Sequence, residues 1–166
     1  MSSAVRIETL DPTHYDRIVE IYNHYILNSA ITFDITPYST ETRSEWFNQF
    51  NAPYYRCFVL MQKEIAQGYA CSTQFRKKDA YVRSVEVSVY LHPDATGQGF
   101  GRTLYQHLFA ALAETDAHRA YAGVTLPNQA SLALHRHYGF TDCGVLHEVG
   151  FKFDRYWDVQ WLEKAL

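Results

Sequence analysis

The sequence predicts an α/β (α+β) protein with a mixed central sheet and the element order βααβββαβαββ. An apolar strand at 82–91 leads through a glycine-rich turn into a helix with an apolar stripe, a unit typical of parallel strand pairing. Runs at 56–62 and 65–75 flank a two-residue turn, Lys63-Glu64, and so form a hairpin. The length of 166 residues suits one domain over 1–166.

The N-terminal part is predicted to hold a short strand at 5–8 and two helices. Asp11-Pro12 opens the first helix, and 28–39 is a loop because it has no hydrophobic period. A second short helix is expected at 40–50, with Thr40 as its N-cap. The apolar stripe of the first helix consists of Ile18, Ile21, Tyr22, Tyr25 and Ile26.

The C-terminal half begins with the helix after the glycine turn, whose stripe is Leu104, Leu108 and Leu112. A strand at 120–125 and a helix at 129–138, which Gly139 ends, are expected next. Two alternating runs, 143–153 and 155–164, form a final antiparallel pair.

Composition excludes several classes of function. The chain is 47% hydrophobic with a net charge of −3, which argues against nucleic acid and anionic membranes as partners. It shows neither a signal-like N-terminus nor a membrane-length apolar run, so we expect a cytoplasmic location and no membrane. Cys57, Cys71 and Cys143 are expected to be buried and reduced. Neither the cysteines nor the eight histidines have metal-ligand spacing, so no metal is expected.

Three glycines, Gly97, Gly99 and Gly101, stand at alternate positions between the strand and the helix. Glycines let backbone N–H groups point inward, and a helix N-terminus adds unpaired donors and a positive dipole end. This arrangement favours a pyrophosphate, although a plain glycine-rich connection has the same pattern. The spacing matches neither G-x-G-x-x-G nor a loop ending in G-K-[ST].

The spacing instead resembles the acetyl-CoA loop of the GNAT superfamily, with Thr96 where Gln or Arg is usual. Within that superfamily the chain resembles the phosphinothricin N-acetyltransferase and methionine sulfoximine acetyltransferase family. Four stretches carry the resemblance: IYNHYILNSAITF at 21–33, QFRKKDAYVRSVEVSVYLHPDATGQGFGRTLY at 74–105, GVTLPNQASLALHRHYGF at 123–140 and EVGFKFDRYWDVQWLEK at 148–164. The resemblance implies the GNAT fold and acetyl transfer from acetyl-CoA to the α-amino group of a small amino acid, such as phosphinothricin, methionine sulfoximine or methionine sulfone. It also implies a homodimer closed by the final hairpin.

Two residues are implied as catalytic by this resemblance. Glu86 would deprotonate the incoming ammonium, and burial would raise its pKa to a useful value. His135 would protonate the departing thiolate, with Tyr138 as the reserve candidate. The alternatives are that Glu86 is a structural partner of Arg83 or another cation and that His135 is a surface histidine.

Binding residues follow from the same resemblance. Val89, Tyr90 and Leu91 would present backbone groups to the pantetheine, and one N–H at Val89 or Tyr90 would hold the oxyanion. The residues expected at the rest of acetyl-CoA are Gly97, Gln98, Gly99, Phe100, Gly101, Arg102, Asn128 and Ser131. Asn128 fits a helix N-cap equally well.

The amino-acid substrate is expected near a cationic run that resembles the family's F-R-x-R-x-A-Y. Lys78 replaces its second Arg, which removes a bidentate fork. The residues assigned to the substrate are Phe33, Phe75, Arg76, Lys78 and Tyr81, with Tyr25 and Thr32 in the rest of the pocket. A solvated hairpin edge is the alternative for the run. Two rival functions remain: acetylation of a polyamine, aminoglycoside or peptide N-terminus, and a non-catalytic CoA-binding module.

Overall fold

The computed structural model describes residues 4–166 and has the predicted order of strands and longer helices. Seven strands form one mixed sheet in the order β1-β2-β3-β4-β5-β7-β6, so β6 lies at one edge. The strands are β1 (Val5–Thr9), β2 (Cys57–Gln62), β3 (Ile65–Gln74), β4 (Ser84–Leu91), β5 (Arg119–Thr125), β6 (Thr141–Lys152) and β7 (Arg155–Ala165). The helices are α1 (Tyr15–Asn28), α2 (Ser44–Asn48), α3 (Phe100–Ala113) and α4 (Gln129–His137).

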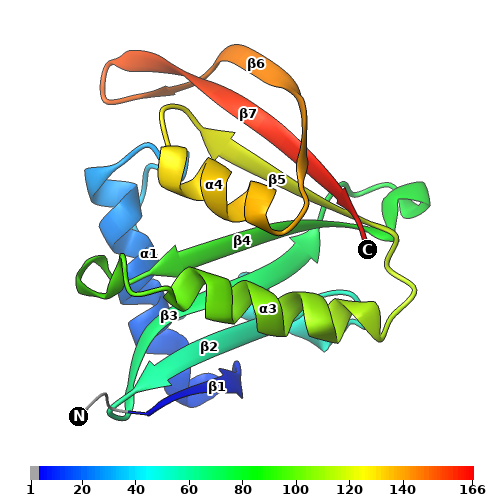
Figure 1. Ribbon diagram of the computed structural model, residues 1–166. Coiled ribbons are helices and arrows are strands. Elements are labelled where there is room, and N and C mark those ends of the chain that lie inside the picture. Colours follow the sequence, from blue (N-terminus) through cyan, green and yellow to red (C-terminus); the bar gives the residue numbers. More distant parts are fainter. Residues whose placement is uncertain (1–3) are drawn as a thin grey trace.

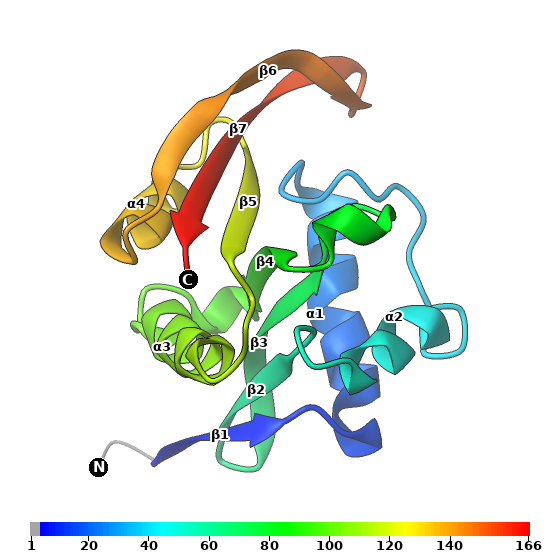
Figure 2. The ribbon, with the colours of Figure 1, turned by 90° about the vertical axis from the view of Figure 1, so that its right-hand side faces the viewer.

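The helices cover the two faces of the sheet in separate layers. Figure 2 shows α1 and α2 on one side of the strands and α3 and α4 on the other. The stripe Leu104, Leu108 and Leu112 is fully buried against the sheet, as its spacing predicted. A second apolar cluster lies between α1 and strands β2 and β3. The sheet is therefore a rigid middle layer from which the site residues project.

The strands β4 and β5 separate along their length, and this separation creates the site. They are parallel, and their pairing ends at Glu86 opposite Tyr121. Beyond that pair β4 continues for five residues along β3, up to Leu91 opposite Gly68, while β5 turns away to pair with β7. In Figure 1 the two strands run apart toward their carboxyl ends. Backbone groups on the open side of β4 are consequently free of sheet partners.

Two local predictions are wrong. The second helix begins at Ser44, and Thr40 does not cap it, because the Thr40 hydroxyl donates to Asp16 on α1 at 2.5 Å. Cys143 is exposed, since it lies on the edge strand β6, whereas Cys57 and Cys71 are buried as expected. Among residues 4–166, no helix is long and apolar enough to cross a membrane.

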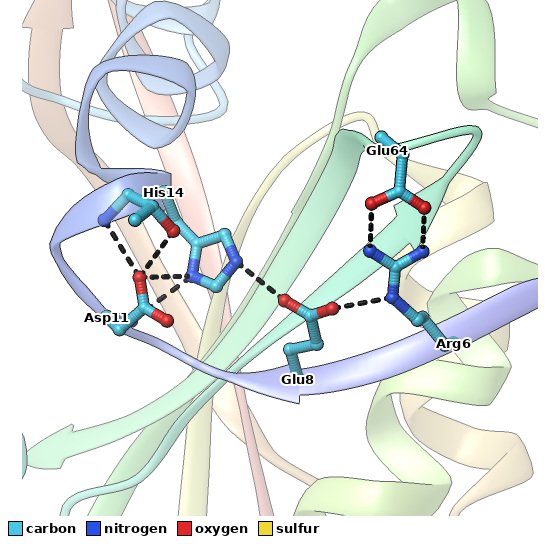
Figure 3. Close-up of polar contacts among 6 residues, drawn as sticks. Arg6, Glu8, Asp11, His14 and Glu64 are labelled. Carbon is cyan, nitrogen blue, oxygen red and sulfur yellow. Dashed lines mark hydrogen bonds and ion pairs between the residues drawn. The ribbon is translucent and has the colours of Figure 1, made fainter.

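A polar network fastens the N-terminal strand to its neighbours (Figure 3). Arg6 binds both carboxylate oxygens of Glu64 in the β2–β3 turn at 2.7 Å and contacts Glu8 at 2.6 Å. Glu8 in turn contacts Nε2 of the buried His14 at 3.0 Å. His14 completes a capping box with Asp11 at the turn that leads into α1. The network therefore holds the N-terminal end of α1 against β1. The helix α1 contributes Tyr22 to the wall of the site.

Candidate active site

Glu86 lies at the point where β4 and β5 part, and its side chain faces a cavity of about 370 Å³. Strand alternation places Ser88 and Tyr90 on the same face, and both also line the cavity. Burial raises the pKa of Glu86, and the nearby charge of Arg76 partly opposes this rise. The alternative role as a partner of Arg83 is not observed, because Arg83 pairs with Asp116 at 2.8 Å. Glu86 is thus a partly desolvated carboxylate aimed into an open space.

The walls of the cavity come from α1 and the loop after it and from the strands β4, β5, β6 and β7. The strand β5 contributes Gly123 and Thr125. Gly123 has no side chain, and a Cβ at this position would lie 3.3 Å from the Trp161 ring. Most of the remaining wall is apolar. It consists of Ile31, Thr32 and Phe33 after α1, Leu146 and Val149 on β6, and Val159 and Trp161 on β7, together with Tyr22 on α1.

A second, smaller cavity of about 50 Å³ adjoins the first between β4 and β5. It is lined by Asn128, Ser131 and His135, which the sequence had assigned to the site, and by Tyr105, which it had not. The two cavities share the wall residues Ile31, Ser88, Tyr90, Gly123 and Thr125. Glu86 and His135 therefore face two parts of one continuous hollow.

His135 is buried, so it is not a surface histidine, and both of its ring nitrogens have partners. Nδ1 lies 2.7 Å from the carbonyl oxygen of Ser131, which can only accept, so Nδ1 carries a hydrogen. Nε2 lies 2.9 Å from the hydroxyl of Tyr105. Burial lowers the pKa of His135, so the neutral ring accepts the Tyr105 hydrogen at Nε2. The reserve candidate, Tyr138, is directed away from the hollow and donates to the Arg102 carbonyl at 2.6 Å.

Beyond Glu86, the backbone N–H and C=O groups of every second residue of β4 face the gap toward β5. The N–H of His92 donates to Gln67 on β3 at 2.7 Å, so the N–H of Tyr90 also faces β3. The Val89 backbone then faces the gap toward β5. The Leu91 carbonyl is on this side too, but it already accepts the Tyr25 hydroxyl at 2.6 Å. Of Val89 and Tyr90, therefore, Val89 offers the free N–H.

The glycine turn presents a row of unpaired backbone donors at the start of α3. Gly97 and Gly99 have φ of +74° and +82°, a region that L side chains rarely adopt. Within residues 4–166, no backbone or side-chain acceptor receives the N–H groups from Gly97 to Gly101. Gly101 is buried, and a Cβ there would meet Leu134 at 3.3 Å. Such a row is suited to bind a phosphate group.

Asn128 does cap α4, since its side-chain oxygen accepts the Ser131 N–H at 3.1 Å. Its amide also lines the smaller cavity, so capping and ligand contact are compatible at this position. The two readings of Asn128 are therefore not exclusive.

The cationic run lies beside the hollow and not in its walls. Of the residues assigned to the amino-acid substrate, only Phe33, with Thr32, lines the larger cavity. Phe75 stacks on Tyr121 with ring centroids 4.3 Å apart, and the Arg76 guanidinium lies 5.0 Å from the Phe75 ring. Lys78 and Tyr81 stand at the exposed turn before β4. A substrate role for this run stays a prediction.

Tyr105, the hydrogen-bond partner of His135, is a site residue that sequence reasoning missed. It follows Leu104 in the buried stripe of α3, where an aromatic residue reads as core. The available signal was its hydroxyl, because a buried tyrosine needs a polar partner. That partner is on α4, thirty positions further along the chain.

Comparison with known proteins places the whole fold in one family. Residues 7–161 match the family model described as an acetyltransferase (GNAT) domain. A phosphinothricin N-acetyltransferase of Streptomyces coelicolor is 46% identical over 153 residues, which cover 90% of this chain and 89% of that protein. An L-methionine sulfoximine/L-methionine sulfone acetyltransferase of Salmonella typhimurium is 33% identical over 149 residues, with 90% and 87% coverage.

Solved structures agree with these relatives. A putative acetyltransferase, yncA, from Salmonella typhimurium, determined with acetyl-CoA, superposes with a TM-score of 0.93 at 32% identity, covering 98% of this chain and 94% of that one. A phosphinothricin acetyltransferase from Sinorhizobium meliloti in complex with acetyl-CoA gives a TM-score of 0.92 at 29% identity, with coverage of 100% and 89%. The predicted fold and resemblance are confirmed. The chain is an N-acetyltransferase of the GNAT family, in the group of the phosphinothricin and methionine sulfoximine acetyltransferases.

Proposed function

We propose that this enzyme moves an acetyl group from acetyl-CoA to the α-amino group of a small amino acid of the phosphinothricin, methionine sulfoximine or methionine sulfone type. The observation that carries the proposal is the placement of Glu86, a carboxylate of raised pKa, where β4 and β5 separate, beside a cavity lined by both apolar and polar residues. Release of CoA with a panel of amines tests it. Relatives at 46% and 33% identity are named for such amino acids.

The chain offers a fitting site for acetyl-CoA. The unpaired N–H row from Gly97 to Gly101 would hold the pyrophosphate, and the α3 N-terminus adds its dipole. The Val89 backbone and the Asn128 amide would contact the pantetheine arm in the gap beside β4. The bound thioester supplies the activated acetyl group. No metal is part of this proposal.

Glu86 begins the reaction as the general base. A substrate ammonium is not nucleophilic until it loses a proton, and a carboxylate of raised pKa accepts that proton more readily than an ordinary one. The free amine then attacks the thioester carbonyl directly, while both substrates are bound, and the nitrogen loses its second proton to solvent before the C–S bond breaks. The Val89 N–H, free of a sheet partner, would stabilise the oxyanion.

The pair His135 and Tyr105 would return a proton to the departing thiolate. Because Nδ1 of His135 is held by the Ser131 carbonyl, only Nε2 can exchange a proton toward the hollow. Once the neutral His135 has taken a proton from solvent, its Nε2 donates to the Tyr105 oxygen, and the Tyr105 hydroxyl donates to sulfur. His135 ends neutral and CoA leaves as a thiol.

Gly99→Ala is expected to weaken acetyl-CoA binding about tenfold or more, roughly 1.4 kcal/mol, because an L side chain at a φ of +82° distorts the N–H row. Gly139→Ala is the matched control. It has a φ of +83° at the end of α4, where the nearest contact is the end of the Lys164 side chain at 3.8 Å. Equilibrium binding measured on both folded variants checks this. Equal losses in the two variants would mean that strain, and not the phosphate cradle, explains the effect.

Arg76→Ala is expected to shift the pH dependence of kcat/KM. Activity rises with pH as Glu86 loses its proton, and the Arg76 charge lowers the pKa of Glu86. Removing that charge moves the acidic limb to higher pH. Lys77→Ala, which changes the neighbouring cation, is the control. An acidic limb that stays in place in Arg76→Ala would contradict the coupling.

The exposed apolar residues of the β6–β7 pair, among them Phe151 and Tyr156, suit the predicted homodimer. The cytoplasmic location stays a prediction.

The rival acceptors, polyamines and aminoglycosides, would need a strongly acidic pocket, and among residues 4–166 Glu86 is the only carboxylate that lines the larger cavity. The binding-module alternative conflicts with the family's activity.

A further inference from the structure

The strand β6 contains an irregular segment at 147–149 that faces the acceptor cavity. Pairing with β7 is regular at Leu146 opposite Val159 and again at Gly150 opposite Trp157. Three residues of β6 therefore stand against the single residue Asp158, and Glu148 has a φ of +51°. This is a β-bulge, and bulges commonly redirect a side chain next to a functional site.

The bulge changes which side chains reach the cavity. In a regular strand, residues three positions apart point to opposite faces. Leu146 and Val149 nevertheless both line the acceptor cavity. The extra residues between them therefore turn the half-exposed Val149 toward the cavity. In a regular strand Glu148, two positions from Leu146, would face the cavity in place of Val149.

Asp158 holds the bulge from the neighbouring strand. Its Oδ1 accepts the Glu148 N–H at 2.7 Å, and its Oδ2 lies 3.2 Å from Nδ1 of His147. Both contacts are with bulge residues. The carboxylate thus takes the place of the ladder hydrogen bonds that the bulge interrupts.

The same part of β6 also positions Phe33. The ring lies directly on Gly150, where a Cβ would come within 2.2 Å of the Phe33 Cε2. Two residues on, the buried Lys152 ammonium donates to the Thr32 carbonyl at 2.9 Å and so ties the loop after α1 to β6. In Figure 2 the far end of the β6–β7 pair reaches over this loop. Val149 and Phe33 then form one apolar wall of the cavity.

We propose that the β6 bulge, held by Asp158, is the element that selects the acceptor by side-chain width, through Val149 and through the Phe33 ring seated on Gly150. The inference rests on the proposed function and names its substrate class more closely. The wall is apolar and close to Glu86, so it accepts a slender, unbranched side chain of the methionine type and rejects an aromatic ring. Asp158 is a positioning residue that acts through Val149.

The test compares kcat/KM for L-methionine sulfone and L-phenylalanine in the full-length protein. Val149→Ala removes two methyl groups from the wall and should shift the ratio toward phenylalanine about tenfold or more. Asp158→Ala should shift the ratio in the same direction, because it releases the bulge. The KM for acetyl-CoA should change less than twofold in both variants. Ile65→Ala, an exposed change on β3 outside the cavity wall, should leave the ratio unchanged.

A second pair of variants tests the seat of Phe33. Gly150→Ala forces the ring away and should lower kcat/KM for methionine sulfone about tenfold or more. Adding Phe33→Ala to Gly150→Ala should restore much of that loss, because the displaced ring is gone. Restoration is not expected if Gly150→Ala only destabilises the protein.

The outcomes separate this inference from the proposed function. An acceptor ratio that stays constant in Val149→Ala and Asp158→Ala overturns the inference alone, as does a ratio that moves equally in Ile65→Ala. A wild-type enzyme that acetylates no amino acid but does acetylate spermidine overturns both.

Discussion

Glu86→Gln should lower kcat/KM for an amino-acid acceptor by roughly 10²–10⁴-fold, the usual contribution of a general base. Glutamine keeps the size and a hydrogen-bonding oxygen at the parting of β4 and β5 but cannot take a proton. The loss should be partly recovered at high pH, where free amine is abundant without help. Steady-state kinetics across pH, with the KM for acetyl-CoA as the internal control, check this.

For the wild-type enzyme, the direction of the pH dependence of kcat/KM can be stated. Burial raises the pKa of Glu86, so kcat/KM should fall with decreasing pH at a value above about 4.3, the ordinary pKa of a glutamate. A Glu86→Gln variant that keeps this acidic limb, or that is not helped by high pH, would show that Glu86 only positions the substrate.

His135→Ala is expected to act later, at departure of the thiolate, and to lower kcat by roughly 10²–10⁴-fold. Its defect should shrink with a thioester whose thiol leaves more easily, while the Glu86→Gln defect should not. Tyr105→Phe should produce a similar defect, because its hydroxyl lies 2.9 Å from Nε2 of His135 and carries the proton onward. Tyr138→Phe, which loses a hydroxyl bound to the Arg102 carbonyl, is the control and should retain activity.

The double variant Tyr105→Phe/His135→Ala distinguishes a relay from two independent contacts. Residues that act in series lose little more together than either loses alone. Multiplied defects would show that His135 and Tyr105 reach the substrates separately. In addition, the kcat of the wild type should decline with rising pH from a value below 6.5, because burial lowers the pKa of His135.

The fold was predictable because its signals are local. The Lys63-Glu64 turn does adopt positive φ at both residues, and Gly139 ends α4 with a φ of +83°, as turn chemistry requires. Thr40 failed as a cap because the distant Asp16 takes its hydroxyl. The prediction that Cys143 is buried was wrong because its apolar neighbours in sequence do not reveal that β6 is an edge strand.

The site was predictable only where one strand or loop defines it. Alternation along β4 was enough to predict that Glu86 points to the opposite face from Val85, Val87 and Val89. Pairings between distant elements were not accessible in this way. The Tyr105–His135 contact joins α3 to α4, and the bulge at 147–149 depends on Asp158 across the ladder. Neither contact can be predicted from the spacing of residues in the sequence.

CoA release with competing acceptors tests most directly whether the acceptor is a small amino acid. Purified enzyme with acetyl-CoA should release CoA with methionine sulfoximine, methionine sulfone or phosphinothricin at a kcat/KM well above that for spermidine or an aminoglycoside. Mass spectrometry should find the acetyl group on the α-amino nitrogen of the product. Faster release with the polycations, or no release with any of the three amino acids, would contradict the account.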